Sequence, residues 1–133
     1  MALDLSVNYY ICGDELSFPR FANAVRRAGM TLGGVTRAAM AELGLAGVKS
    51  CLDDHGLAVS SLNSAEIFTV GDPNQIQYSN EEMIDDAADL NADILCVIAG
   101  GLGTPPLPVA EAHRRVRGAW TGGPKGGCST PSR

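Results

Sequence analysis

Residues 53–64, with the sequence DDHGLAVSSLNS, decide the fold, because they combine the end of a helix, a turn and a strand. Gly56 stands where the helical pattern of the preceding residues ends. The next stretch, LAVSSLN at 57–63, has the composition of a buried strand. A helix that passes through a single glycine into a strand is typical of an α/β repeat.

Further strands are predicted on both sides of this stretch, and each is bounded by turn residues. They cover residues 5–12, 30–37 and 93–100. The last, DILCVIAG, has the strongest strand pattern in the chain, whereas two adjacent glycines weaken the one at 30–37. The sequence therefore predicts four strands.

Helical segments with apolar residues at helical spacing separate these strands. They are predicted at 17–29, at 38–55, from residue 79 and from residue 109. Gly44 and Gly47 are expected to divide the second segment, and Ser79 with Glu82 has the spacing of a capping box. Four alternating strand–helix pairs predict parallel strands with right-handed crossovers. An open doubly wound sheet and a closed barrel share this pattern.

Composition is that of one globular domain, with 45% hydrophobic residues among 133. No apolar run approaches the roughly 20 residues that cross a membrane, and no secretory signal precedes the first strand. A cytoplasmic location is therefore expected. The four cysteines, at 12, 51, 96 and 128, form no Cys-x-x-Cys pair, which predicts buried thiols rather than a metal site or disulfides.

Charge divides the chain into two parts. Residues 1–112 hold all 15 acidic residues and five basic ones, whereas residues 113–133 hold five basic residues and no acid. The acidic body disfavours nucleic acid as a partner. Residues 118–133 contain five glycines and two prolines without apolar periodicity, which predicts a disordered tail after a domain at 1–117. Such an abrupt change is what translation in a wrong frame would produce, so a frameshifted or truncated gene product is one hypothesis.

Three segments carry a family resemblance: SFPRFANAVRRAGM at 17–30, DDHGLAVSSLNS at 53–64 and AADLNADILCVIAGGL at 87–102. In their order and spacing they resemble the sugar phosphate isomerase/epimerase family of the xylose isomerase-like barrel superfamily, over about residues 3–117. The resemblance implies a TIM-type (β/α)8 barrel. Such a barrel needs about 250 residues, so the chain is expected to form only its N-terminal (β/α)4 half.

The resemblance also implies chemistry that this chain would not contain by itself. Full-length members bind a divalent metal (Mn, Mg or Zn) through carboxylates and a histidine in the second half of the barrel. The metal polarises a sugar or small hydroxy-carbonyl substrate while two glutamates move a proton. No metal ligand or catalytic residue maps onto this sequence. The chain is therefore expected to be a truncated isomerase or epimerase that is inactive alone. The alternatives are a degenerate, inactive fragment and a metabolite- or phosphate-binding α/β module.

Candidate substrate-binding residues are those expected at the carboxyl ends of the strands, where barrels place their active sites. They are Asn8, Arg37, Asn63, Glu66, Gly100 and Gly101. The asparagines could bond sugar hydroxyls, Arg37 could pair with a phosphate or carboxylate, and Glu66 is expected in the loop after the third strand. Loop capping by the asparagines and a solvated arginine are the ordinary alternatives. The glycines lack the spacing of a nucleotide-binding loop.

Half a barrel would leave its first and fourth strands as open edges. Exposed strand edges pair readily with other chains, so the chain is predicted to be either a marginal, aggregation-prone monomer or an oligomer that self-associates through these edges. Other expected partners are limited to a small sugar-like molecule, with neither nucleic acid nor membrane.

Overall fold

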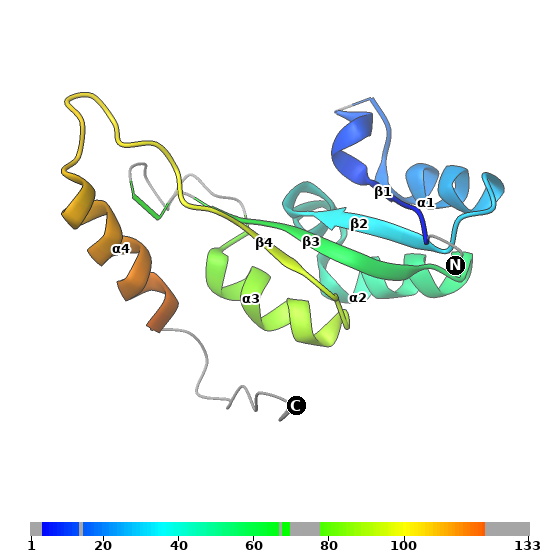
Figure 1. The fold of residues 1–133 in the computed structure, drawn as a ribbon. Coiled ribbons are helices and arrows are strands. Elements are labelled where there is room, and N and C mark those ends of the chain that lie inside the picture. The colour runs from blue at the N-terminus through cyan, green and yellow to red at the C-terminus, as the bar shows by residue number, and fades with distance from the viewer. Residues whose placement is uncertain (1–3, 14, 67, 70–77, 122–133) are drawn as a thin grey trace.

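The computed structural model describes residues 4–13, 15–66, 68–69 and 78–121, which form one parallel sheet with strand order β1-β2-β3-β4 (Figure 1). The strands are β1 (Ser6–Asn8), β2 (Leu32–Thr36), β3 (Ala58–Glu66) and β4 (Leu95–Ile98). The helices are α1 (Phe18–Arg27), α2 (Arg37–His55), α3 (Asn80–Asp89) and α4 (Val109–Thr121), and a 3-10 helix, η1 (Tyr9–Cys12), follows β1. The predicted order of four strand–helix pairs is confirmed, and all three strand pairings are parallel.

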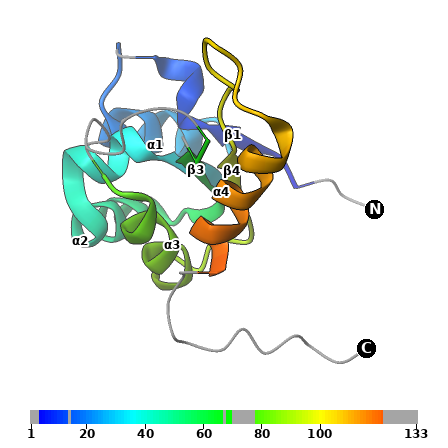
Figure 2. The ribbon, with the colours of Figure 1, turned by 90° about the vertical axis from the view of Figure 1, so that its left-hand side faces the viewer.

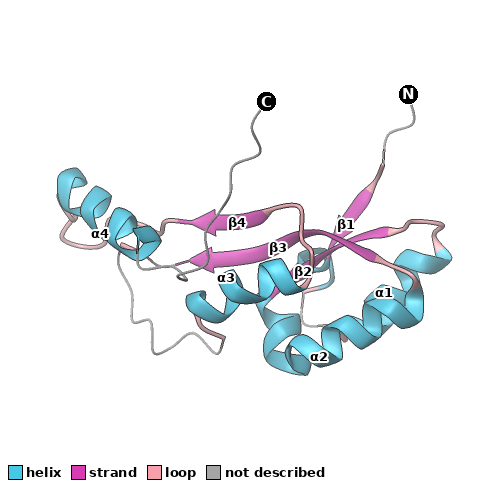
Figure 3. Ribbon diagram, turned by 90° about the horizontal axis from the view of Figure 1, so that it is seen from below, coloured by secondary structure: helices cyan, strands magenta, loops and turns pink. Residues whose placement is uncertain are grey.

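The three helices α1, α2 and α3 lie on one face of the sheet and leave the other face uncovered (Figure 3). The core lies between these two layers. Phe18, Met40 and Met83 come from the helices and Val35 and Leu62 from the strands, all at most 1% exposed. Burial of these side chains, each contributing roughly 1.5–3 kcal/mol, holds the helices on this face.

The first strand is shorter than predicted, because η1 replaces its second half. The side chain of Asn8 accepts a hydrogen bond from the backbone N–H of Tyr10 and so caps the 3-10 turn. The turn places Tyr9 in the core, where its ring stands edge-on to Phe18 at a centroid distance of 5.3 Å. Packing of this aromatic ring overrides the strand propensity of the sequence YYIC.

The second helix is interrupted as predicted, at one of the two glycines. Gly44 has φ 65° and ψ 171°, which breaks α2 into a short and a longer piece. That backbone region is accessible almost only to glycine. Gly47 is helical, so the break is confirmed at Gly44 alone.

Two boundaries differ from the sequence prediction. Strand β3 continues to Glu66, three residues beyond the predicted end, so Glu66 is a strand residue rather than a loop residue. Helix α4 runs to Thr121 and passes through Gly118, where the tail was predicted to begin. The remaining residues of that predicted tail, 122–133, lie outside the described residues.

The predicted capping box is confirmed, whereas burial of the thiols is confirmed for only one of the three described cysteines. Ser79 and Glu82 form the predicted capping box at the start of α3. Cys51 is buried, Cys12 and Cys96 are half-buried, and Cys128 lies outside the described residues. Within the described part of the chain, no helix has the length and apolarity needed to cross a bilayer.

Helix α4 lies apart from the other three helices. It is beyond the carboxyl ends of β3 and β4, on the far side of the loop that leaves β4 (Figures 1 and 2). Arg115 ties it to this end of the molecule by donating to the carbonyl of Thr69 at 2.8 Å. The helix side of β4 is consequently left partly open, with Val97 41% exposed.

Candidate functional site

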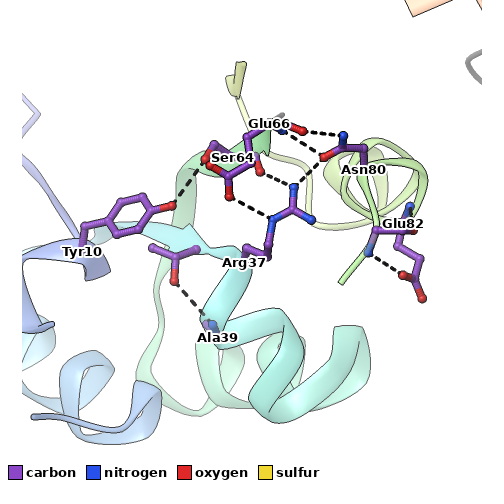
Figure 4. A network of polar contacts seen from close by, with 9 residues as sticks. Tyr10, Arg37, Ala39, Ser64, Glu66, Asn80 and Glu82 are labelled. Atoms are coloured by element: carbon purple, nitrogen blue, oxygen red, sulfur yellow. Dashed lines mark hydrogen bonds and ion pairs between the residues drawn. The ribbon is translucent and has the colours of Figure 1, made fainter. Parts of the chain in front are cut away.

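A polar network lies at the carboxyl ends of the strands, and the start of α2 places its central residue. Helix α2 begins directly after β2 without an intervening loop, because Thr36 caps it by accepting a hydrogen bond from the N–H of Ala39. Arg37 is therefore the first helical residue, and its side chain lies between the carboxyl end of β3 and the start of α3 (Figure 4). Its side chain is only 10% exposed, so the predicted alternative of a solvated arginine is wrong.

The guanidinium of Arg37 joins three different elements. One nitrogen, Nη2, donates to the carbonyl of Ser64 on β3 and to Oδ1 of Asn80 on α3, both at 2.6 Å. Nε lies 3.5 Å from Oε1 of Glu66. Nη1 is buried and makes no hydrogen bond within the described residues. Arg37 thus pairs with a carboxylate, as its residue type suggested, but the carboxylate belongs to this chain.

Asn80 holds the end of β3 through its carboxamide. Its Oδ1 accepts from the N–H of Glu66 at 3.0 Å, and its Nδ2 donates to the carbonyl of Glu66 at 2.8 Å. The side chain thereby supplies the pair of bonds that a neighbouring strand would supply. The backbone of Glu66 is thus held on both sides of its Cα, and its side chain remains 30% exposed.

Two hydroxyl groups extend the network toward β1. Tyr10 Oη lies 3.4 Å from Oγ of Ser64, and Tyr10 is 57% exposed (Figure 4). Ser64 itself is buried. The accessible chemistry of the network is therefore one carboxylate and one phenol, with a buried guanidinium behind them.

Electrostatics set the charges of this network. Burial lowers the pKa of Arg37, and the nearby Glu66 carboxylate opposes that shift. An arginine remains protonated under all ordinary conditions. A fixed positive charge therefore lies behind the exposed Glu66 carboxylate.

Asn8 and Asn63 are both engaged inside the protein, Asn8 as a cap, as its ordinary alternative predicted, and Asn63 within β3 rather than at a loop. Asn8 caps η1, and Asn63 donates to Oγ of Ser61 at 2.9 Å and to the carbonyl of Val35 at 3.4 Å. Gly34 leaves room for Asn8, because a Cβ at Gly34 would stand 2.7 Å from Nδ2 of Asn8. Their predicted role in binding a substrate remains a prediction.

Gly100 and Gly101 lie in the exposed loop after β4 and make no contact with the Arg37 network in the structure as described. The loop is held by Thr69, whose hydroxyl donates to the carbonyls of Ala99 and Gly101 at 3.0 and 2.6 Å. Gly100 has φ 95°, which explains the need for glycine there. Substrate binding by these glycines likewise stays a prediction.

The donor groups of the chain decide whether a metal could bind. Across the described ranges, no three His, Cys, Asp or Glu side chains come together as a metal site. Glu66 has a guanidinium as its neighbour, which disfavours a cation. His55 binds the carbonyl of Cys51 at 2.7 Å, and His113 is exposed on α4. The described residues do not fit a divalent metal.

The sequence identified Arg37 and Glu66 but missed Asn80 and Ser64. Asn80 stands 14 residues after Glu66, and no local pattern links the two positions. The only signal was indirect, because Asn80 follows the capping Ser79 and so had to lie at the start of a helix.

No family model matches the chain, and no curated protein matches it. Several solved structures are similar to this chain, among them the following three. A Sinorhizobium meliloti 1021 protein is 26% identical with a TM-score of 0.70, over 85% of this chain and 42% of that one. A xylose isomerase domain-containing protein of Salmonella typhimurium LT2 is 17% identical with a TM-score of 0.58, over 87% and 43%.

The third similar structure is a xylose isomerase domain protein from Alicyclobacillus acidocaldarius subsp. acidocaldarius, 17% identical with a TM-score of 0.62, over 87% of this chain and 44% of that one. The chain thus spans less than half the length of the structures it matches. Its four parallel strands and alternating helices correspond to half of a TIM barrel. The predicted resemblance is confirmed at the level of the fold, and the chain has the architecture of half a xylose isomerase-like barrel.

Proposed function

We propose that this chain supplies the substrate-holding half of a site for a sugar, sugar phosphate or small hydroxy-carbonyl compound. The single observation that carries the proposal is the Arg37–Glu66–Asn80 network at the carboxyl ends of the strands. In barrels of this type the active site lies at that end. The xylose isomerase domain of the similar structures supports the sugar-like substrate class.

Glu66 is the residue best suited to contact such a ligand. A carboxylate accepts hydrogen bonds from two sugar hydroxyls, and charge-assisted bonds of this kind are stronger than neutral ones. Asn80 holds the Glu66 backbone and Arg37 pairs with its carboxylate, so part of the ordering that a bound hydroxyl requires is already in place. The exposed phenol of Tyr10, on the 3-10 helix η1 that follows β1, offers a second polar group.

Isomerisation itself would require groups outside the described residues. The donor groups present do not fit a metal, and one carboxylate cannot act as both acid and base on opposite sides of a substrate. We therefore assign binding to this half and no step of proton transfer.

The proposal is tested by following the amide NMR spectrum of the 133-residue chain during titration with D-fructose and with D-fructose 6-phosphate. We expect sugar binding to change the amide chemical shifts of residues around Glu66. In Glu66→Gln these changes should be absent, while the remaining signals stay those of a folded protein. Glu81→Gln is the matched control, because Glu81 is exposed on α3.

Two outcomes would contradict the proposal. One is sugar binding that Glu66→Gln leaves unchanged. The other is stoichiometric, tight binding of Mn2+ by the chain alone, which would place a metal site in this half. Binding of the phosphate ester only, lost in Gly101→Ala but not in Glu66→Gln, would favour the phosphate-binding module instead.

A further inference from the structure

Exposed large hydrophobic side chains gather at the two edges of the sheet. Those beside β1 are Leu5, Tyr10 and Ile11, and those on or directly before β4 are Ile94, Val97 and Ile98, whereas Leu102 lies in the loop after β4 and Val109 begins α4. Among the described residues, none lies on the inner strands or on α1, α2 or α3. Most of the exposed large apolar side chains therefore lie close to β1 or β4.

Both edge strands are also open along their backbones. In the described part of the chain, β1 pairs only with β2 and β4 pairs only with β3. Neither edge carries the usual protection, because the strand sequences SVN and LCVI contain no charged residue and no proline. Natural edge strands normally use such residues to prevent pairing with other chains.

The polarity of the two edges is complementary. All four strands run in the same direction, so β4 of one copy can extend its ladder in parallel onto β1 of another copy. A two-fold axis then brings β4 of the second copy onto β1 of the first. This closed arrangement leaves no free edge, whereas a single open-ended contact would leave two.

We propose that two copies of this chain associate in this way, with β4 of each against β1 of the other, to close an eight-stranded parallel barrel. The lengths agree, because the chain spans 42% to 44% of the similar structures and two copies supply twice its four strands. Closure removes from water part of the apolar surface of the two edge strands, where Leu5 beside β1 and Ile98 on β4 are exposed. That burial is the main driving force of association.

Sedimentation velocity of the 133-residue chain tests the proposal without any ligand, so its result is independent of the proposed sugar site. We expect a dimer of twice the 13.8 kDa chain mass. Val97→Glu and Leu5→Lys, which add a charge to β4 and beside β1, should each give monomers. Ala24→Lys on the exposed face of α1 is the control and should remain dimeric.

Mixing the two edge variants gives the sharpest outcome. In the mixed dimer one junction is unmodified, and the other brings the introduced glutamate of one copy to the same junction as the introduced lysine of the other. The mixture should therefore recover the dimer that each variant lacks. Circular dichroism confirms that the variants are folded. If Val97→Glu does not fold, Leu5→Lys alone still tests the proposal. Leu5 is 69% exposed, so its replacement by lysine should leave the fold intact.

Three results would overturn the proposal. They are a monomer of the unmodified chain, dimers that both edge charges leave intact, and assemblies that keep growing with concentration. The last would indicate open-ended edge pairing instead of a closed pair.

Discussion

The carboxamide of Asn80 binds both backbone polar groups of Glu66, accepting from its N–H at 3.0 Å and donating to its carbonyl at 2.8 Å. One side chain at the start of α3 thus completes the end of strand β3. The same Oδ1 accepts from Arg37 at 2.6 Å. The position of the Glu66 carboxylate therefore depends on a residue from another element.

Replacing Asn80 with alanine should destabilise the protein by about 1–3 kcal/mol, because the backbone of Glu66 loses both partners and Arg37 loses one. Urea unfolding followed by circular dichroism measures the change. Asn23→Ala on the exposed face of α1 is the control and should change stability by no more than about 0.5 kcal/mol. Equal effects of the two substitutions would show that the Asn80 bonds contribute nothing.

Replacing Arg37 tests whether its fork geometry or only its charge matters. Arg37→Met should cost about 2 kcal/mol or more, because Ser64 and Asn80 each lose a hydrogen-bond donor and Glu66 loses its ion-pair partner. Arg37→Lys should recover little of that loss, since an ammonium cannot present two separate nitrogens in the plane of a guanidinium. The same unfolding measurement applies.

The matched control for Arg37 is Arg20→Met on the exposed side of α1, which should be nearly neutral. Full recovery of stability by Arg37→Lys would show that the network is a simple charge pair.

The sequence predicted the four repeats because their signals are local. A capping box, a glycine at a helix end and an apolar run each depend on neighbours within about four residues. The break of α2 at Gly44 was predictable for the same reason. The end of β1 was not, since the packing of Tyr9 against Phe18 decided it.

The candidate site was only half predictable. Its residue types at strand ends indicated Arg37 and Glu66, and the structure places the two side chains 3.5 Å apart. The partnership with Asn80 depends on the path of the intervening chain, which no spacing rule gives. Asparagine is a residue type that sugar sites use, yet the side chains of Asn8 and Asn63 form hydrogen bonds with the backbone of this chain.

The capping box of α3 should make stability depend on pH. The pKa of Glu82 is lowered because the backbone N–H of Ser79 donates to its carboxylate, assisted by the Ser79 side chain. A pKa lower in the folded than in the unfolded state stabilises the fold above the ordinary glutamate value of about 4.3. That contribution is lost as the pH falls through the folded value.

The measurement is the free energy of unfolding of the natural chain and of Glu82→Gln between neutral and acidic pH. The difference between them should be constant near neutrality and shrink as the pH falls below about 4.3. Glu81→Gln removes an equally placed first-turn carboxylate outside the capping box and controls for the helix dipole. A difference that does not vary with pH would contradict this account.

Gly34 should resist replacement because strand β1 approaches it closely. A Cβ at this position would lie 2.7 Å from Nδ2 of Asn8 and 3.1 Å from its Cα. Gly34→Ala must therefore push β1 away from β2 or displace the Asn8 side chain that caps η1, at a cost of about 1–3 kcal/mol. Thermal or urea unfolding measures the loss, and the NMR shift of the Tyr10 amide reports on the cap.

The double variant Asn8→Ala, Gly34→Ala separates the two clashes. Removing the Asn8 carboxamide relieves the shorter contact and leaves the one with Cα, so the Gly34→Ala penalty should be smaller in the Asn8→Ala background. Gly118→Ala on α4, where a Cβ meets no atom within 4 Å, should instead stabilise the chain by up to about 1 kcal/mol. An equal penalty in both backgrounds would place the whole cost on the backbone of β1, and no penalty at all would mean that β1 does not lie this close to β2.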